Sequence, residues 1–300
     1  MKVLSLFDGI SCARVALERA GIPVELYLAS EIDKYAVQIS SKNYQDIIHI
    51  GDIKDVSGAY EYDLLIGGSP CQDLSIAKRN RKGLSGDRSG LFWEYVRILK
   101  SCNPKYFILE NVASMPKEAM EEITDILGVQ PIMINASLVS AQNRKRLFWT
   151  NIPNVTQPQD KGILLKDILI DGIAELEKSL VITATYSRAC PQDYFGKSNR
   201  QMIKVGHFNK GGQGDRVYSI QGKSVTLSAL GGGRGAKTGL YETNLGTHRK
   251  LHPIECERLQ GLPDNYTEGV SNTQRYKTLG NAFNVDVIAH ILSFIPKHHD

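Results

Sequence analysis

The sequence predicts an α/β fold with a mostly parallel, doubly wound sheet, followed by a smaller, irregular β-rich domain. Three observations predict it. From residue 1 to about 150, short apolar runs alternate with helix-like stretches, the pattern of a parallel sheet covered on both faces. Beyond Asn151 the alternation ends, and twelve of the 57 residues from 194 to 250 are glycine, which favours loops and short strands. Helical periodicity then returns near the C-terminus.

Each expected element follows from a local pattern. Short apolar runs bounded by turn residues predict strands at 2–7, 24–30, 47–50, 63–67, 106–110, 131–135 and 146–150. Helical spacing predicts helices at 11–20, 33–42, 89–101, 116–127, 253–261 and 284–295. The last helix carries an apolar stripe, so we expect it to pack back on the first domain; the stripe is Val285, Ile288, Ile291 and Leu292.

Composition sets broad limits. The 300 residues suffice for a sizeable core, and 42% hydrophobic with 23% charged residues is ordinary for a globular protein. Asp8 interrupts the apolar start before it reaches the length of a signal peptide, and no apolar stretch is long enough to span a membrane. We expect a soluble intracellular protein. Five irregularly spaced cysteines without a C-x-x-C pair argue against a disulfide framework or zinc knuckle.

One set of residues has metal-ligand spacing. His248, His252 and Cys256 recur every four residues and would share one face of a helix. Pro253 would break that helix, because a proline in the interior removes a backbone hydrogen bond and clashes with the preceding turn. We expect no metal site.

The charge is unevenly distributed. The formal net charge is only +4, but residues 194 to 250 hold ten lysines or arginines against Asp215 and Glu242. Such a basic segment is either a solvated face or the electrostatic footprint for a polyanionic partner.

Three successive strand ends carry residues suited to a nucleoside. "SLFDGIS" at 5–11 is a strand, a tight turn and a helix start, where backbone amides can face a ligand; without a full G-x-G-x-x-G it is equally an ordinary βα turn. Glu31 ends the second strand, 22 residues after Gly9, where a carboxylate can accept both hydroxyls of a ribose. Asp52 follows the third strand. Doubly wound sheets bind nucleosides at this edge.

A cysteine follows the fourth strand. In "GGSPCQD", residues 67 to 73, turn residues end the strand at 63–67 and place Cys71 on a sharp bend. An isolated cysteine is by default a small core hydrophobe. Five basic residues and one acid lie between Lys78 and Arg88, and nearby positive charge favours the thiolate form.

These motifs, in this order, resemble the S-adenosylmethionine-dependent cytosine-5 methyltransferase family. The ordered series is FDG at 7–9, Glu31, GDI at 51–53, SPCQ at 69–72, ENV at 110–112, Q-x-R-x-R at 142–146 and GNA at 280–282. "SPCQDLSIAKRNRKGL" and "VSAQNRKRLFWTNIP" further resemble the catalytic domain of vertebrate de novo DNA methyltransferases, whereas GNA is similar to bacterial and phage members. The resemblance implies a Rossmann-like class I methyltransferase fold.

The resemblance also implies a chemistry. A Cys71 thiolate adds to C6 of cytosine and makes C5 nucleophilic, while Glu110 stabilises charge at N3. Glu110 and Asn111 could alternatively be a helix-capping pair. Arg144 and Arg146 are expected on one strand face, reaching a base carbonyl and a phosphate, with Arg146 the candidate for cytosine O2; a solvated strand end is the alternative. The base must flip out of the duplex, and residues 78 to 90 are expected to close over it.

The resemblance assigns the remaining site residues by position. Phe7 is expected to stack on the adenine of S-adenosylmethionine, Asp52 to accept from its amine, and Ile32 to supply aliphatic packing. The expected cofactor-binding set is Phe7, Asp8, Gly9, Ile10, Ser11, Glu31, Ile32, Asp52, Ile53, Ser69, Pro70, Asn281 and Ala282. The expected DNA-binding set is Ser75, Lys78, Arg79, Arg81, Lys82 and Arg88 in the basic loop, with Arg234 and Lys237 in a glycine-rich segment that resembles target-recognition regions.

The expected organisation is a catalytic and cofactor-binding domain at 1–152, a target-recognition domain at 153–274 and a C-terminal segment at 275–300. The expected protein is a cytoplasmic, nucleoid-associated monomer that acts on a specific cytosine in duplex DNA, with a cognate restriction endonuclease as a candidate partner. Two alternatives stay open: methylation of tRNA cytosine, and a catalytically silent DNA-binding homologue. Amino methylation is disfavoured, because Ser69-Pro70-Cys71-Gln72 stands where those enzymes carry Asp/Asn-Pro-Pro-aromatic.

Overall fold

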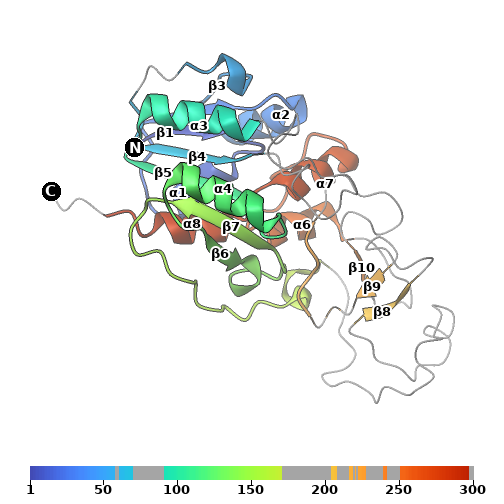
Figure 1. The fold of residues 1–300 in the computed structure, drawn as a ribbon. Helices are drawn as coiled ribbons and strands as arrows, with labels where there is room; N and C mark the ends of the chain where they lie inside the picture. Colours follow the sequence, from blue (N-terminus) through green and yellow to red (C-terminus); the bar gives the residue numbers. More distant parts are fainter. Residues whose placement is uncertain are drawn as a thin grey trace, which may run out of the picture. The chain divides into compact units, whose positions relative to one another are not determined.

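The computed structural model describes residues 1–57, 61–69, 91–170 and 251–296, with short pieces at 204–207, 216–218, 220, 222–227 and 239–241 (Figure 1). The chain divides into two compact units. The first unit comprises residues 1–135, 145–158 and 283–300, and the second comprises 136–144 and 159–282. The functional division at 152 and 274 remains a prediction.

A seven-stranded sheet forms the centre of the first unit, in the order β3-β2-β1-β4-β5-β7-β6. The first five strands in chain order pair in parallel, and β7 runs antiparallel to both β5 and β6. This confirms the predicted mostly parallel, doubly wound sheet. The strands are β1 (Lys2–Leu6), β2 (Leu26–Ser30), β3 (Ile47–His49), β4 (Leu64–Gly68), β5 (Tyr106–Val112), β6 (Ile132–Asn135) and β7 (Lys145–Thr150).

Helices cover both faces of this sheet. Figure 1 shows α3 (Leu91–Cys102) and α4 (Lys117–Leu127) in front of it, with α1 (Cys12–Arg19) and α8 (Val285–Leu292) behind. The front core joins apolar side chains of α3 and α4 to alternate residues of β1, β4, β5 and β7. Helix α2 (Lys34–Asn43) follows β2. Parallel strands buried on both faces require continuous apolar runs, which is why the sequence displays these strands clearly.

The terminal helix α8 packs against α1. Its apolar stripe is buried, and Arg19 of α1 forms an ion pair with Asp286 of α8 at 3.1 Å. The α8 N-terminus is capped by the Asn284 side chain, which accepts from the Val287 amide.

The second unit is less regular where it is described. It contains 3₁₀ helices at Ala136–Leu138 and Leu165–Ile168, a small sheet in the order β10-β9-β8, and two helices. The strands are β8 (Lys204–His207), β9 (Arg216–Tyr218) and β10 (Leu240–Tyr241). The helices are α6 (Pro253–Leu259) and α7 (Asn272–Asn281). The sequence predicts α6 and overlooks α7, a polar helix.

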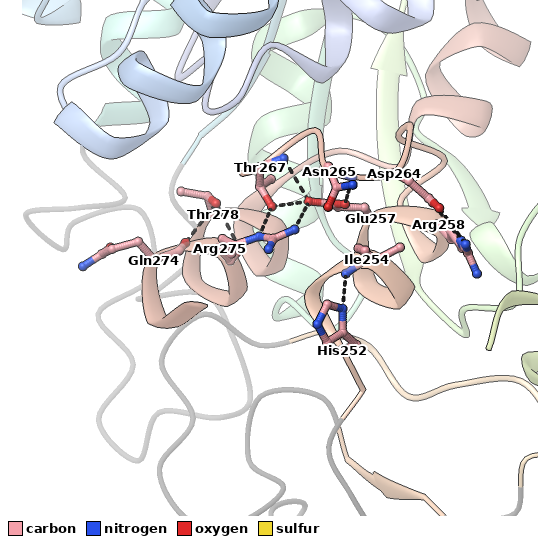
Figure 2. Close-up of polar contacts among 10 residues, drawn as sticks. All are labelled: His252, Ile254, Glu257, Arg258, Asp264, Asn265, Thr267, Gln274, Arg275 and Thr278. Atoms are coloured by element: carbon pink, nitrogen blue, oxygen red, sulfur yellow. Dashed lines mark hydrogen bonds and ion pairs between the residues drawn. The ribbon is translucent and has the colours of Figure 1, made fainter. Parts of the chain in front are cut away.

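A buried carboxylate joins α6 to α7. Glu257 of α6 is fully buried and accepts from the backbone amides of Asn265 and Thr267, from the Thr267 hydroxyl, and from Arg275 of α7 at 2.8 Å (Figure 2). Arg275 also donates to the Thr267 hydroxyl. These hydrogen bonds hold α7 in place, because α7 buries little apolar surface of its own.

Proline and histidine act as helix starters in α6. Pro253 occupies the first turn, where its missing N–H leaves no bond unmade, and the His252 side chain accepts from the Ile254 amide at 3.3 Å. His248 of the metal-ligand spacing lies outside the described residues. Among the described residues, no helix is long and apolar enough to cross a membrane.

Candidate active site

The turn after β1 has an unusual backbone. Phe7, Gly9 and Ser11 all lie in the left-handed region, with φ of 55°, 63° and 61°. Glycine adopts this conformation freely, whereas residues with a Cβ rarely do. The left-handed turn directs the Gly9 amide at the Glu31 carboxylate, to which it donates at 2.8 Å.

Three backbone amides hold the Glu31 carboxylate at the end of β2. Gly9 donates to Oε2, and Ile32 and Asp33 both donate to Oε1 at 2.8 Å. A carboxylate can accept about four hydrogen bonds, so capacity remains for further donors. Ile32, immediately beside it, is 73% exposed. A carboxyl group held by three amides therefore lies next to an exposed aliphatic side chain.

The third acid lies after β3. Asp52 caps the 3₁₀ helix at Ile53–Asp55 by accepting from the Lys54 amide at 3.0 Å through Oδ1. Within the described part of the chain, Lys54 is its one hydrogen-bond donor. Its Oδ2 accepts from none of the described residues. Ile53 is buried, so any contribution it makes to a cofactor surface comes through its backbone.

These residues suit an adenosine-containing cofactor. A ribose offers two hydroxyl donors and an adenine offers an amine and two apolar faces, matching Glu31, Asp52 and the exposed Ile32. Phe7 is half-buried at the margin of the core. Asp8 and Ser11, by contrast, are buried side chains that bond to other residues of the protein. Ile10 is buried in the same turn.

The end of β4 is packed too closely for a side chain. A Cβ on Gly67 would lie 2.8 Å from the Leu6 carbonyl oxygen, and one on Gly68 would lie 2.8 Å from the Phe283 ring. Gly68 is also directly opposite Glu110 in the sheet, and its Cβ would be 3.2 Å from Glu110 Oε2. Gly68 therefore leaves the space that Glu110 occupies, and Gly67 allows close packing against Leu6.

Asn111 anchors the residue that follows β4. Its Nδ2 donates to the Ser69 hydroxyl at 3.1 Å, and both side chains are buried. Sequence reasoning quoted Asn111 within ENV but gave it no role of its own. Strand alternation would have supplied the signal, because neighbouring residues of one strand point to opposite faces and Asn111 could not share the environment of Glu110.

Glu110 pairs with Arg146. Both lie in strands, so the helix-capping alternative for Glu110 and Asn111 is wrong. Arg146 is opposite Val112 of the antiparallel β5–β7 pair and therefore shares the sheet face of Glu110. Its Nε lies 2.8 Å from Glu110 Oε1, with side-chain exposures of 15% and 12%. Arg146 also donates to the Lys145 carbonyl at 2.9 Å. The pair is largely desolvated but still accessible.

Arg144 lies outside β7, which begins at Lys145, and belongs to the second unit. It is buried and donates to the carbonyl oxygens of Gly280 at 3.4 Å and Ala282 at 3.0 Å, at the end of α7. Gln260 donates to the Leu279 carbonyl nearby at 2.7 Å. These two side chains satisfy carbonyls that the helix end leaves unpaired.

The other expected residues divide into two groups. Asn281 ends α7 and Ala282 is its buried C-cap, both in the second unit. The following lie outside the described residues: Pro70, Cys71, Ser75, Lys78, Arg79, Arg81, Lys82, Arg88, Arg234 and Lys237. No group of histidine, cysteine or acidic side chains suited to a metal occurs within the described ranges.

The sheet order, the acids at the strand ends and the nearby residues that match an adenosine are typical of a Rossmann-like methyltransferase. The sequence profile described as "C-5 cytosine-specific DNA methylase" matches residues 1–297. The chain belongs to this family. It is thus a DNA cytosine-5 methyltransferase, and the cofactor of the family is S-adenosylmethionine.

Individual relatives agree with this assignment. The Type II methyltransferase M.HhaI of Haemophilus parahaemolyticus is 32% identical over 316 residues, covering 97% of this chain and 93% of the relative. The orphan methyltransferase M.SPRI of Bacillus phage SPR is 30% identical over 323 residues, covering 88% and 73%. Among solved structures, the Dnmt2 methyltransferase of S. pombe shares the fold, with a TM-score of 0.68, 20% identity, and coverage of 98% and 97%.

Proposed function

We propose that this enzyme methylates C5 of a cytosine flipped out of duplex DNA, using Cys71 as the nucleophile. The observation that carries the proposal is the Glu110–Arg146 pair, an acid on β5 and a cation on β7. Strand β5 pairs with β4, and the end of β4 leads into Cys71. An acid and a cation at one strand edge match the N3 and O2 positions of cytosine.

The proposed reaction has two stages, addition of the thiolate to C6 and its elimination after methyl transfer. The Cys71 thiolate adds to C6, breaking the C5–C6 double bond, and Glu110 shares a proton with N3 as electron density moves into the ring. Arg146 donates to O2 and keeps Glu110 oriented. S-adenosylmethionine would supply the methyl group that C5 accepts, leaving as the thioether S-adenosylhomocysteine. Solvent water would then take the C5 proton, and the electrons of that C–H bond re-form the C5–C6 double bond as the Cys71 thiolate leaves C6.

We assign the two arginines of Q-x-R-x-R to different tasks. Arg146 is partly accessible and is assigned to the base, whereas Arg144 is buried and donates to the carbonyls of Gly280 and Ala282, which flank Asn281. Arg144 therefore supports the segment that carries two of the expected cofactor-binding residues. The cofactor contacts themselves are proposed for Phe7, Glu31, Ile32, Asp52 and the Asp8–Ser11 turn, with Ser69, Pro70, Asn281 and Ala282.

DNA binding is proposed for the basic loop and the glycine-rich segment. Their lysines and arginines would neutralise phosphates, so affinity for DNA should fall steeply with added salt. We further propose a cytoplasmic, nucleoid-associated monomer. Its relatives include proteins named Type II and proteins named orphan methyltransferases, and a cognate restriction endonuclease is the candidate partner.

Methyl transfer and trapping test the proposal. With labelled S-adenosylmethionine, the wild type should methylate duplex DNA and Cys71→Ser should not, while Cys102→Ala, which removes a buried cysteine of α3, should retain activity. A duplex carrying 5-fluorocytosine at the target should form a covalent adduct through Cys71. Transfer to tRNA alone, or activity that survives Cys71→Ser, would overturn the proposal; bisulfite sequencing of plasmid DNA gives the target sequence.

A further inference from the structure

The cofactor turn holds two residues in a conformation that their side chains disfavour. Phe7 and Ser11 have a Cβ and nevertheless lie at φ of 55° and 61°. Such residues persist in the left-handed region only where their surroundings enforce it.

Asp8 is the centre of those surroundings. Its carboxylate is 4% exposed and accepts from the Ser11 hydroxyl at 2.5 Å and from the Tyr27 hydroxyl of β2 at 2.7 Å. Ser40 of α2 lies 2.6 Å from the Ser11 hydroxyl, whose hydrogen is already used, so Ser40 donates to it. The Asp8 amide donates to the Ser30 carbonyl at 3.1 Å. Tyr27 of β2 and Ser11 of the turn thus meet at one buried carboxylate, and Ser40 of α2 joins the network through Ser11.

Ser11 bonds within this network and does not cap helix α1. A serine at the N-cap of a helix normally has extended backbone and accepts from an amide of the first turn. Ser11 is the N-cap of α1, yet it is left-handed and makes no side-chain cap. Asp33 and Asn284, the N-caps of α2 and α8, are extended and do make one. The hydroxyl of Ser11 is therefore committed to the turn rather than to the helix.

The network ends at the cofactor acid. Gly9 lies between Asp8 and Ser11, and its amide donates to Glu31. If the turn relaxed to ordinary φ values, this amide would rotate away and one of the three donors on Glu31 would be lost. Asp8 can therefore influence cofactor binding although neither of its carboxylate oxygens contacts the cofactor.

We propose that Asp8 is a positioning residue, which fixes the left-handed turn so that Gly9 orients Glu31 and thereby sets the affinity for S-adenosylmethionine. This inference rests on the proposed cofactor role of Glu31. Asp8 acts through the backbone and does not contact the cofactor with its side chain.

Cofactor binding measured without DNA tests the inference directly. By calorimetry, Asp8→Asn should raise the Kd for S-adenosylmethionine about tenfold, or 1.4 kcal/mol. In methylation assays it should raise the KM for the cofactor similarly, while kcat at saturating cofactor changes less than about threefold. Tyr27→Phe removes one donor and should weaken binding less. Tyr44→Phe removes a hydroxyl that donates to Glu18, away from the turn, and should leave the Kd unchanged.

A pair of Ser11 variants keeps the test decisive if Asp8→Asn folds poorly. Ser11→Ala loses the hydroxyl and keeps the disfavoured Cβ, whereas Ser11→Gly loses the hydroxyl and adopts the left-handed conformation freely. Ser11→Ala should therefore bind the cofactor at least about threefold more weakly than Ser11→Gly. Equal affinities of these two variants would overturn the inference.

Glu31→Gln separates this inference from the proposed function. If Glu31→Gln binds the cofactor as tightly as the wild type, the proposed cofactor site is wrong. If Glu31→Gln weakens binding but Asp8→Asn and Ser11→Ala do not, the site stands and the inference fails. If all three weaken it, the Asp8→Asn and Glu31→Gln effects should combine to less than their product, because both act on one carboxylate.

Discussion

Two glutamate–arginine pairs of this protein have the same shortest N–O distance, 2.8 Å, in different surroundings. Glu257 is fully buried and accepts from four donors, including Arg275 (Figure 2). Glu110 is 12% exposed, and Arg146 is its one partner among the described residues. A fully buried carboxylate that already accepts four hydrogen bonds holds structure together. One with lone pairs to spare can bind a substrate.

The largest effect, a loss of kcat, is expected at the Glu110–Arg146 pair. Glu110→Gln should lower kcat by about 10²–10⁴, because a general acid in the transition state contributes that much. Its free energy of unfolding should change by less than about 1.5 kcal/mol, the net value of one hydrogen bond. Steady-state methylation and urea denaturation measure the two. A large loss of stability with little loss of activity would make Glu110 a structural residue like Glu257.

At the Glu257–Arg275 pair, substitution should affect stability. Arg275→Met should lower the free energy of unfolding by about 3–5 kcal/mol, because it leaves the Glu257 charge buried without a cation. Arg258→Met is the matched control: Arg258 pairs with Asp264 at 2.6 Å at an exposed site, so its loss should cost under about 1 kcal/mol. Urea denaturation of both variants makes the measurement, and similar losses would contradict the distinction.

Gly68 gives a test of the space beside Glu110. Gly68→Ala would place a Cβ against Phe283 and Glu110, so we expect a loss of about 1–3 kcal/mol in stability, as for other overpacked sites. Activity should fall further than stability alone explains, since Glu110 must move. Gly222→Ala, where nothing lies within 4 Å of the new Cβ, is the control and should retain both.

Asp8 and Asp264 should change the free energy of unfolding with pH in opposite directions. Burial raises the pKa of Asp8 above 3.8, although its hydroxyl donors act against this. Between 3.8 and the raised pKa, the native state binds more protons than the unfolded state, so stability falls as pH rises through that window. Asp8→Asn should remove this slope. Unfolding free energies of both proteins from pH 4 to 8 measure it, and parallel curves would contradict the prediction.

The smallest effect belongs to Asp264. The hydrogen bond from Arg258 lowers the pKa of its carboxyl below 3.8. Its contribution to stability is therefore present above 3.8 and is lost as pH falls through the native pKa. Because the pair is exposed, solvent screening keeps this contribution small. Asp264→Asn should flatten the acid limb of the wild-type stability curve slightly, and a steeper limb would be the opposite result.

The first unit was predictable because its strands are apolar on both faces and end at turn residues. Glu31 and Asp52 could be located from strand ends alone, whereas Glu110 was assigned through the family resemblance. Helix α7 could not be predicted from the sequence, because its residues NTQRYKTLGN lack an apolar stripe and include Gly280. Its stability depends on Glu257, a partner that sequence periodicity does not reveal.

The arginine motif shows a second limit. Period-two alternation predicted that Arg144 and Arg146 share a strand face, but the strand begins between them and the two are anchored in different units. Asn111 illustrates a third limit, because its role depends on the distance to Ser69, 42 residues away. Local patterns carry direction and spacing along a strand, whereas such roles depend on which segments meet.

The reversed direction of β7 has a consequence for locating catalytic groups in sheets of this kind. Since β7 runs against β5, the first residues of one strand lie beside the last residues of the other, as Arg146 lies opposite Val112. A search restricted to the positions downstream of each apolar run would therefore pass over Arg146. Scanning the positions upstream of one apolar run as well would find it from sequence alone.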